Sequence, residues 1–258
     1  MKFSIITPTY KRKELLKKAV TSLQAQTYKD WEMIIVNDSP RDEAYLDFAS
    51  SINDHRIHYY VNNTNRGVNY SRNFALEKLS ADSRWVIFLD DDDYLSPDAL
   101  QTFRNLILLH GEQKWFVTNR AYANGRSITK FPKDNKHYSY SLSYLIFKRI
   151  KGDATHCIET KLLTQKKIKF SRYVKQGEEW FFFYQLGLYT DIYYSDHNST
   201  ISGGYDTTSG LNFRKRGMLE QIKVLSILFF EGFSKELLYH PSFIFYVCIR
   251  LVRACIPR

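Results

Sequence analysis

The residues best suited to chemistry are four consecutive aspartates, Asp90 to Asp93. They follow an apolar run, Trp85 to Leu89, which predicts a strand buried on both faces. Open α/β sheets bind ligands at the C-terminal ends of such strands. Carboxylates gathered there repel one another, and hard divalent cations prefer oxygen ligands. The pattern favours a metal site over the alternative, a solvated acidic turn before a helix that Ser96-Pro97-Asp98 would begin.

Alternating strands and helices would position these aspartates. Strands are expected over residues 3–9, 31–36, 57–61 and 85–89, and helices over 11–26, 43–51, 68–79 and 98–109. Strand, helix and strand in succession form right-handed βαβ units. The first hundred residues therefore predict an α/β fold with a mostly parallel sheet and helices on both faces.

The second half of the chain alternates less regularly. We expect a strand at 115–118, a hairpin or loop at 120–140, helices at 141–150 and 177–186, a strand at 191–194 and a mobile loop at 201–210. From Leu211 the composition becomes apolar and basic. This tail is typical of a helix lying in a membrane interface. The alternative is a helix packed on the core or in a dimer contact, and the sequence leaves both open.

The net charge of +10 implies an anionic partner, and nucleic acid, a membrane surface or a phosphorylated substrate would each fit. The sequence predicts neither a signal peptide nor a membrane-spanning run. The three cysteines lack metal-ligand spacing and indicate a reducing compartment. We therefore expect a cytoplasmic protein, peripheral on the inner face of the cytoplasmic membrane if the tail binds there.

Several segments, in order, resemble the inverting family 2 glycosyltransferases with the GT-A fold. They are Ile5-Ile-Thr-Pro-Thr-Tyr-Lys-Arg12, Ser22-Leu-Gln-Ala-Gln-Thr27, Ile35-Val-Asn-Asp-Ser39, Asn65-Arg-Gly-Val-Asn-Tyr-Ser-Arg-Asn73 and Phe88-Leu-Asp-Asp-Asp-Asp93. Further along, Gly177-Glu-Glu-Trp180 resembles the Glu-Asp segment that carries the family's catalytic base. The resemblance implies a nucleotide-sugar donor, most often UDP-linked, and a Mn²⁺ or Mg²⁺ cofactor.

The resemblance also assigns roles to residues around the metal. Asp92 would bind the metal, and Asp90 stands at the matching Asp-x-Asp spacing. Asp90 and Asp91 would hold the ribose or the donor sugar, with Asp93 supporting the metal ligands. His197 lies where some relatives have a histidine for metal or diphosphate, although a lone histidine is more often structural.

Other assignments concern the nucleotide. Asp38 would pair with uracil, unless it only forms an Asx turn at its strand end. Thr7, Pro8 and Thr9 would lie against the base. Arg72 would touch base or phosphate, or else be an ordinary surface arginine of its helix.

For the reaction, the resemblance assigns the catalytic base to Glu179, with Glu178 as the second candidate. The alternative is an acidic helix N-terminus, which is favourable in any helix. The domain prediction is a catalytic domain over 1–210, with a nucleotide-binding half at 1–100 and an acceptor half at 101–210, followed by a helical extension at 211–258.

Two rival functions remain at this point. A nucleic-acid-binding module would explain the charge but not four carboxylates at a strand end. A non-catalytic membrane scaffold would explain the tail but not the ordered motifs. The prediction is therefore metal-dependent sugar transfer, with inversion, from a UDP-sugar to a surface glycan such as lipopolysaccharide or a lipid-linked oligosaccharide. Nucleic acid is not an expected partner, and the oligomeric state stays open.

Overall fold

The structure is a computed structural model that describes residues 1–132, 136–203, 217–234 and 237–255. Within these residues, nine strands form one sheet in the order β3-β2-β1-β4-β8-β6-β9-β5, with β7 paired to β9. The strands are β1 Lys2–Thr9, β2 Trp31–Asn37, β3 Ile57–Val61, β4 Ser83–Phe88, β5 Asp93–Leu95, β6 Trp115–Ala121, β7 Lys136–Tyr138, β8 Ala154–Glu159 and β9 Ile192–Ser202. The helices are α1 Lys13–Gln24, α2 Ala44–Ser51, α3 Val68–Leu76, α4 Ala99–Leu109, α5 Thr160–Gln165, α6 Trp180–Gly187, α7 Met218–Ser234 and α8 Pro241–Cys255, with short turns η1 Ser141–Ile146 and η3 Leu237–Tyr239.

The first half of the sheet is parallel, as predicted. β1 pairs in parallel with β2 and with β4, and β2 pairs in parallel with β3. Their carboxyl ends therefore lie along one edge, and the loops that carry Asp38 and Asp90 to Asp93 follow that edge. β2 is buried along its whole length, because helices cover both faces of the sheet.

The second half differs from the prediction in three places. β8 runs antiparallel to β4 and β6, so the sheet is mixed. β9 extends to Ser202, well beyond the predicted strand at 191–194, because its polar residues pair with β6 and β5. The predicted helix at 141–150 is a single π-helical turn, η1. The predicted loop at 201–210 lies outside the described residues from position 204 onward.

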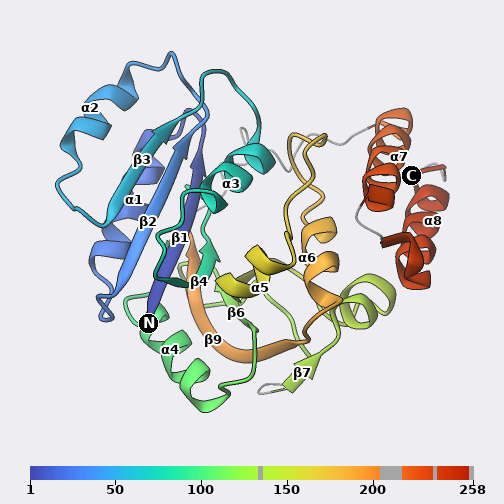
Figure 1. Cartoon of the computed structure of the whole chain (residues 1–258). Helices are drawn as coiled ribbons and strands as arrows, with labels where there is room; N and C mark the ends of the chain where they lie inside the picture. Colours follow the sequence, from blue (N-terminus) through green and yellow to red (C-terminus); the bar gives the residue numbers. More distant parts are fainter. Residues whose placement is uncertain (133–135, 204–216, 235–236, 256–258) are drawn as a thin grey trace.

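Two helical layers enclose the sheet (Figure 1). Residues of α1, α2 and α4 form the core on one face. Residues of α3, α5 and α6 form the core on the other face, and α7 and α8 join this second layer. The Phe243 ring of α8 lies 5.3 Å from Tyr184 and 6.2 Å from Phe181, both on α6.

The C-terminal helices thus pack on the helical layer formed by α3, α5 and α6, which was one of the two interpretations of the tail. Leu228 of α7 and Phe243 of α8 are completely buried. Within the described residues, no helix is both long and apolar enough to cross a membrane.

Candidate active site

The acidic cluster, Asp90 to Asp93, lies between the end of β4 and the start of β5. Asp90, Asp92 and Asp93 can each present one carboxylate oxygen, and these oxygens all lie within 4.8 Å of one another. Thr9, at the end of neighbouring β1, donates a hydrogen bond of 2.8 Å to Asp91. The predicted position of the cluster, at the carboxyl edge of the parallel strands, is confirmed.

Three arginines offset the repulsion between these carboxylates. Arg12, just before α1, contacts Asp91 at 2.9 Å and Asp92 at 2.8 Å. The guanidinium of Arg120, on β6, lies 2.6 Å from Asp93. Arg72 on α3 lies 2.8 Å from Asp90.

Arg12 and Arg120 were not predicted from the sequence as parts of this site. Arg12 ends one of the quoted motifs, which was a usable signal. Arg120 had none, because only the pairing of β6 with β8 and β9 brings it to the cluster.

The carboxyl groups of the cluster differ in how readily they ionise. Burial raises the pKa of Asp91 to about 7 although Arg12 is close. Burial likewise raises the pKa of Asp93 to about 7 against the attraction of Arg120. At Asp90, although the side chain is half exposed, partial desolvation also opposes ionisation, but the charge of Arg72 outweighs it and the pKa is lowered.

The cluster fits the divalent cation that the family resemblance implies. Its oxygens are the ligands that hard cations prefer, and their spacing allows several to share one ion. Four carboxylates face three guanidinium groups, so the cluster has room for further positive charge. The Asp90 side chain is 48% exposed, which leaves it accessible to a ligand.

Arg72 joins the acidic cluster to the predicted catalytic base. It is only 7% exposed, so the interpretation as a surface arginine is wrong. Besides Asp90, its guanidinium contacts the Glu179 carboxylate at 3.2 Å and lies 5.2 Å from the Phe170 ring centre. Burial disfavours its charge, but Asp90 and Glu179 together raise the pKa of Arg72. Arg72 therefore connects the acidic cluster and Glu179 through two ion pairs.

The two candidate bases have different surroundings. The Glu179 side chain, at the N-terminus of α6, is 42% exposed. Glu178 is 9% exposed and accepts a hydrogen bond from the Trp180 indole. Its carboxylate also pairs with Arg250 of α8 at 3.2 Å. Glu178 has a φ of +62°, a left-handed conformation unusual for glutamate. Of the two candidates, Glu179 therefore presents the accessible carboxylate beside the acidic cluster.

Asp38 stabilises the loop before α3, a role that the sequence did not reveal. Its carboxylate is buried and accepts hydrogen bonds from Asn62 at 2.7 Å and from the backbone N–H groups of Arg66 at 2.8 Å and Gly67 at 2.7 Å. These bonds fix the loop before α3. The Asx turn at this strand end is made by Asn37, which accepts a bond from the Ser39 N–H. The uracil contact of Asp38 remains a prediction.

The predicted base-contacting residues lie at the end of β1, beside this loop. Thr9 bonds Asp91 and Tyr45, which ties it to the acidic cluster. The Thr7 hydroxyl is buried and has no hydrogen-bond partner among the described residues. Pro8 pairs in register with Val36 of β2. Their contact with a nucleotide base remains a prediction.

The structure does not bring His197 to the acidic cluster. One ring nitrogen of His197 lies 3.1 Å from the Asp98 carboxylate, and the other lies 3.0 Å from the Ser199 hydroxyl. The residue therefore sits against the start of α4. Among the described residues, Asp93 rather than His197 joins Asp90 and Asp92 in the group of carboxylates that could hold a metal ion. On β9, Ser202 pairs with Asp93, and His197 lies five residues earlier on the strand. The sequence spacing did not reveal this separation.

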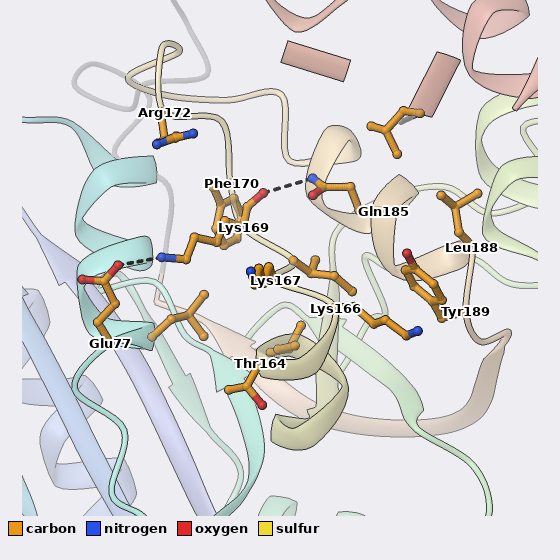
Figure 2. Close-up of a pocket in the computed structure, with 14 residues that line it drawn as sticks. Glu77, Thr164, Lys166, Lys167, Lys169, Phe170, Arg172, Gln185, Leu188 and Tyr189 are labelled. Atoms are coloured by element: carbon orange, nitrogen blue, oxygen red, sulfur yellow. Dashed lines mark hydrogen bonds and ion pairs between the residues drawn. The ribbon is translucent and has the colours of Figure 1, made fainter. Parts of the chain in front are cut away.

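A cavity of about 880 Å³ lies apart from these residues (Figure 2). The ends of α3, α5 and α6 line it, and no residue of the acidic cluster does. Lys166 and Lys167 follow the C-terminus of α5, where cations are favourable beside the helix carbonyl groups. Lys169 pairs with Glu77 at 2.6 Å. The cavity therefore lies outside the site that the acidic cluster and Glu179 define.

Comparison with known proteins identifies the class. The family model described as Glycosyl transferase family 2 matches residues 4–169. The chain therefore belongs to glycosyl transferase family 2. Its fold is the GT-A fold of S. aureus TarS, since the structure of TarS 1-349 with UDP-GlcNAc aligns with a TM-score of 0.73 at 22% identity, covering 88% of this chain and 65% of the TarS 1-349 chain. The predicted family and fold are confirmed.

Two curated relatives are more similar in sequence, each over a shorter stretch. The chain is 40% identical over 103 residues to the GalNAc(5)-diNAcBac-PP-undecaprenol beta-1,3-glucosyltransferase of Campylobacter jejuni, covering 39% of this chain and 33% of the relative. It is 41% identical over 91 residues to the UDP-Glc:alpha-D-GlcNAc-diphosphoundecaprenol beta-1,3-glucosyltransferase WfaP of Escherichia coli, covering 35% of each. The matches thus span about a third of each relative's length.

Proposed function

We propose that this chain is a metal-dependent inverting glycosyltransferase. It would transfer a hexosyl or N-acetylhexosaminyl group from a UDP-sugar to a lipid-linked surface glycan, at the inner face of the cytoplasmic membrane. The observation that carries this proposal is the Arg72 bridge, which places the exposed carboxylate of Glu179 beside the acidic cluster. Donor and acceptor chemistry would then share one site.

For the donor, Asp90, Asp92 and Asp93 would hold Mn²⁺ or Mg²⁺. Such an ion, when bound, offsets the negative charge that develops on the leaving diphosphate. Arg12 and Arg72 keep the carboxylates in place from two sides. Asp38 and the end of β1 would contact the uridine, because both lie at the same edge of the sheet.

For the acceptor, Glu179 would take the proton from the attacking hydroxyl. That hydroxyl approaches the anomeric carbon from the side opposite the diphosphate, which inverts the configuration. Glu178 is the poorer candidate, because Arg250 and Trp180 already occupy its carboxylate. Arg72 orients Glu179 by direct contact.

The relatives support the choice of substrates. One is named for a UDP-Glc donor, and both are named for undecaprenol-linked acceptors. TarS was crystallised with UDP-GlcNAc. A UDP-sugar and a lipid-linked glycan are therefore the substrate classes to test first.

Calorimetric titration with UDP, with and without Mn²⁺, tests the donor half of the proposal. We expect binding that requires the metal and that Asp92→Asn weakens at least about tenfold, because one ligand loses its charge. The conservative variant Asp98→Asn, outside the cluster, serves as control. Metal-independent binding of equal strength in all three proteins would contradict the proposal.

A further inference from the structure

The helices α7 and α8 have two unlike faces. Their inner residues, such as Leu228 and Phe243, are buried against the rest of the protein. Apolar or aromatic side chains on the two helices, and one on η3 between them, remain exposed by 39% to 85%. We call these residues the outer face: Phe230, Phe233, Tyr239, Ile244, Phe245 and Val252. Figure 1 shows the two helices side by side at one edge of the molecule.

The exposed residues of α8 are arranged as one stripe. Ile244, Phe245, Cys248, Val252 and Cys255 recur at intervals of one to four positions and are all exposed. Such spacing places side chains along one side of a helix. The opposite side, with Phe243 and Val247, is already buried. Large exposed apolar patches usually mark a binding surface for a protein or a membrane.

The exposed charges in this part of the molecule favour one kind of partner. Lys223 and Arg253 are exposed on the same two helices. Phe147, Lys148 and Arg149 are exposed directly after η1, which contacts α8. Aromatic and apolar residues flanked by cations are the features of helices that lie in an anionic membrane interface.

Carboxylates oppose this charge only weakly. Among the described residues of α7 and α8, Glu220 is exposed at the start of α7. Glu231 is buried and accepts a hydrogen bond of 2.6 Å from Ser171. The exposed charge of this part of the molecule is therefore mainly positive.

We propose that the outer face binds the surface of an anionic lipid bilayer, with α7 and α8 lying in the interface. This inference rests on the proposed function, since a bilayer is where a lipid-linked acceptor is held. The segment Gly177-Glu-Glu-Trp180 carries the proposed base, and we call it the base segment. The inner side of α8 contacts it through the ion pair between Arg250 and Glu178. A bilayer on the outer side would then be about one helix diameter, roughly 10 Å, from that segment.

Flotation of the full chain with lipid vesicles tests this proposal. The vesicles contain phosphatidylcholine alone or phosphatidylcholine with phosphatidylglycerol. The wild type should float with the phosphatidylglycerol vesicles and less with phosphatidylcholine alone. Phe245→Glu/Val252→Glu should reduce flotation at least about tenfold, because two side chains that would enter the lipid become charged.

Leu108→Glu/Leu109→Glu is the matched control. These leucines are also exposed, but they lie on α4 in the opposite helical layer. This control should float like the wild type. Unchanged flotation of the Phe245/Val252 variant, or no flotation of the wild type, would overturn the proposal.

The other occupant to consider is a second copy of the chain. Sedimentation velocity without vesicles distinguishes the two occupants. A wild-type dimer that dissociates in the Phe245→Glu/Val252→Glu variant would overturn the membrane proposal.

UDP titration of the same variants separates this inference from the proposed function. Retained Mn²⁺-dependent UDP binding with lost flotation supports membrane docking, whereas flotation without any UDP binding by the wild type contradicts only the enzymatic proposal.

Discussion

At the residue scale, Arg72 holds the site together. It contacts Asp90 on one side and Glu179, 107 positions further along the chain, on the other. Sequence motifs placed each of these residues in the site separately. Only the structure shows that one guanidinium lies between the two carboxylates and contacts both. The roles of Glu179 and of the buried aspartates can therefore be tested one side chain at a time.

Glu179→Gln should lower the turnover of sugar transfer about 100-fold or more, while UDP binding with Mn²⁺ stays unchanged. The amide keeps the shape of the side chain and most of its contact with Arg72, but it cannot accept the proton of the acceptor hydroxyl. Steady-state transfer assays beside calorimetric UDP titrations provide the measurement. Glu178→Gln is the comparison, and a larger loss in that variant would move the base to Glu178.

The pH dependence of stability should reveal the buried carboxyl group of Asp91. Its pKa is raised from the ordinary value of 3.8 to about 7 in the folded protein. The folded state therefore binds more protons than the unfolded state between these values, so stability falls as pH rises from about 4 to 7. In EDTA, the melting temperature of Asp91→Asn should depend less on pH over this window than that of the wild type. Parallel curves for the two proteins would contradict the assignment.

At the element scale, α8 reaches back to the base segment. Arg250 pairs with Glu178 at 3.2 Å and lies 5.5 Å from the Trp180 ring centre. Glu178 adopts a left-handed conformation that its surroundings must hold in place. The family model ends at residue 169, so it covers neither the base segment nor α8. This contact belongs to the chain's own C-terminal half.

Arg250→Ala should reduce turnover about tenfold without changing UDP affinity. Loss of the Arg250–Glu178 ion pair would shift the neighbouring base, Glu179, and a base displaced by a fraction of an ångström is less effective. Transfer assays and UDP titrations measure the two effects separately. Arg250→Lys should restore part of the activity, since it keeps the charge. Arg84→Ala, an exposed arginine near the start of β4, is the control. Equal losses in the Arg250 and Arg84 variants would remove the positioning role.

At the scale of the whole molecule, the C-terminal helices pack into the same hydrophobic core as α6. Leu225, Leu228, Phe243 and Val247 join the same hydrophobic cluster as Trp180 of α6. A tail that only tethered the protein to a membrane would not contribute to this cluster. The chain therefore positions its base segment and exposes its outer face with the same pair of helices.

Removal of residues 217–258 should lower the melting temperature by at least about 10 °C. Each buried apolar side chain that is lost removes about 1.5–3 kcal/mol, and 1 kcal/mol shifts the melting of a chain this size by about 2–4 °C. Differential scanning calorimetry of the full and shortened chains provides the comparison. An unchanged melting temperature would show that α7 and α8 are not part of the folding unit.

The sequence by itself determined the features that depend on neighbouring residues. Hydrophobic periodicity predicted the alternating strands and helices of the first hundred residues, and β1 to β4 follow it closely. The apolar run before Asp90 placed the acidic cluster at a strand end. Ordered motifs identified the family. These features can be predicted because the backbone geometry and burial of a strand or helix depend mainly on residues close together in the chain.

Only the tertiary structure decided which distant side chains meet. Sheet pairing brought Arg120 to Asp93 and took His197 to the start of α4. Helix packing joined Arg250 to Glu178, 72 positions apart. The physical reason is that strand order, register and helix docking set these contacts, and each depends on the packing of the whole core rather than on any local pattern.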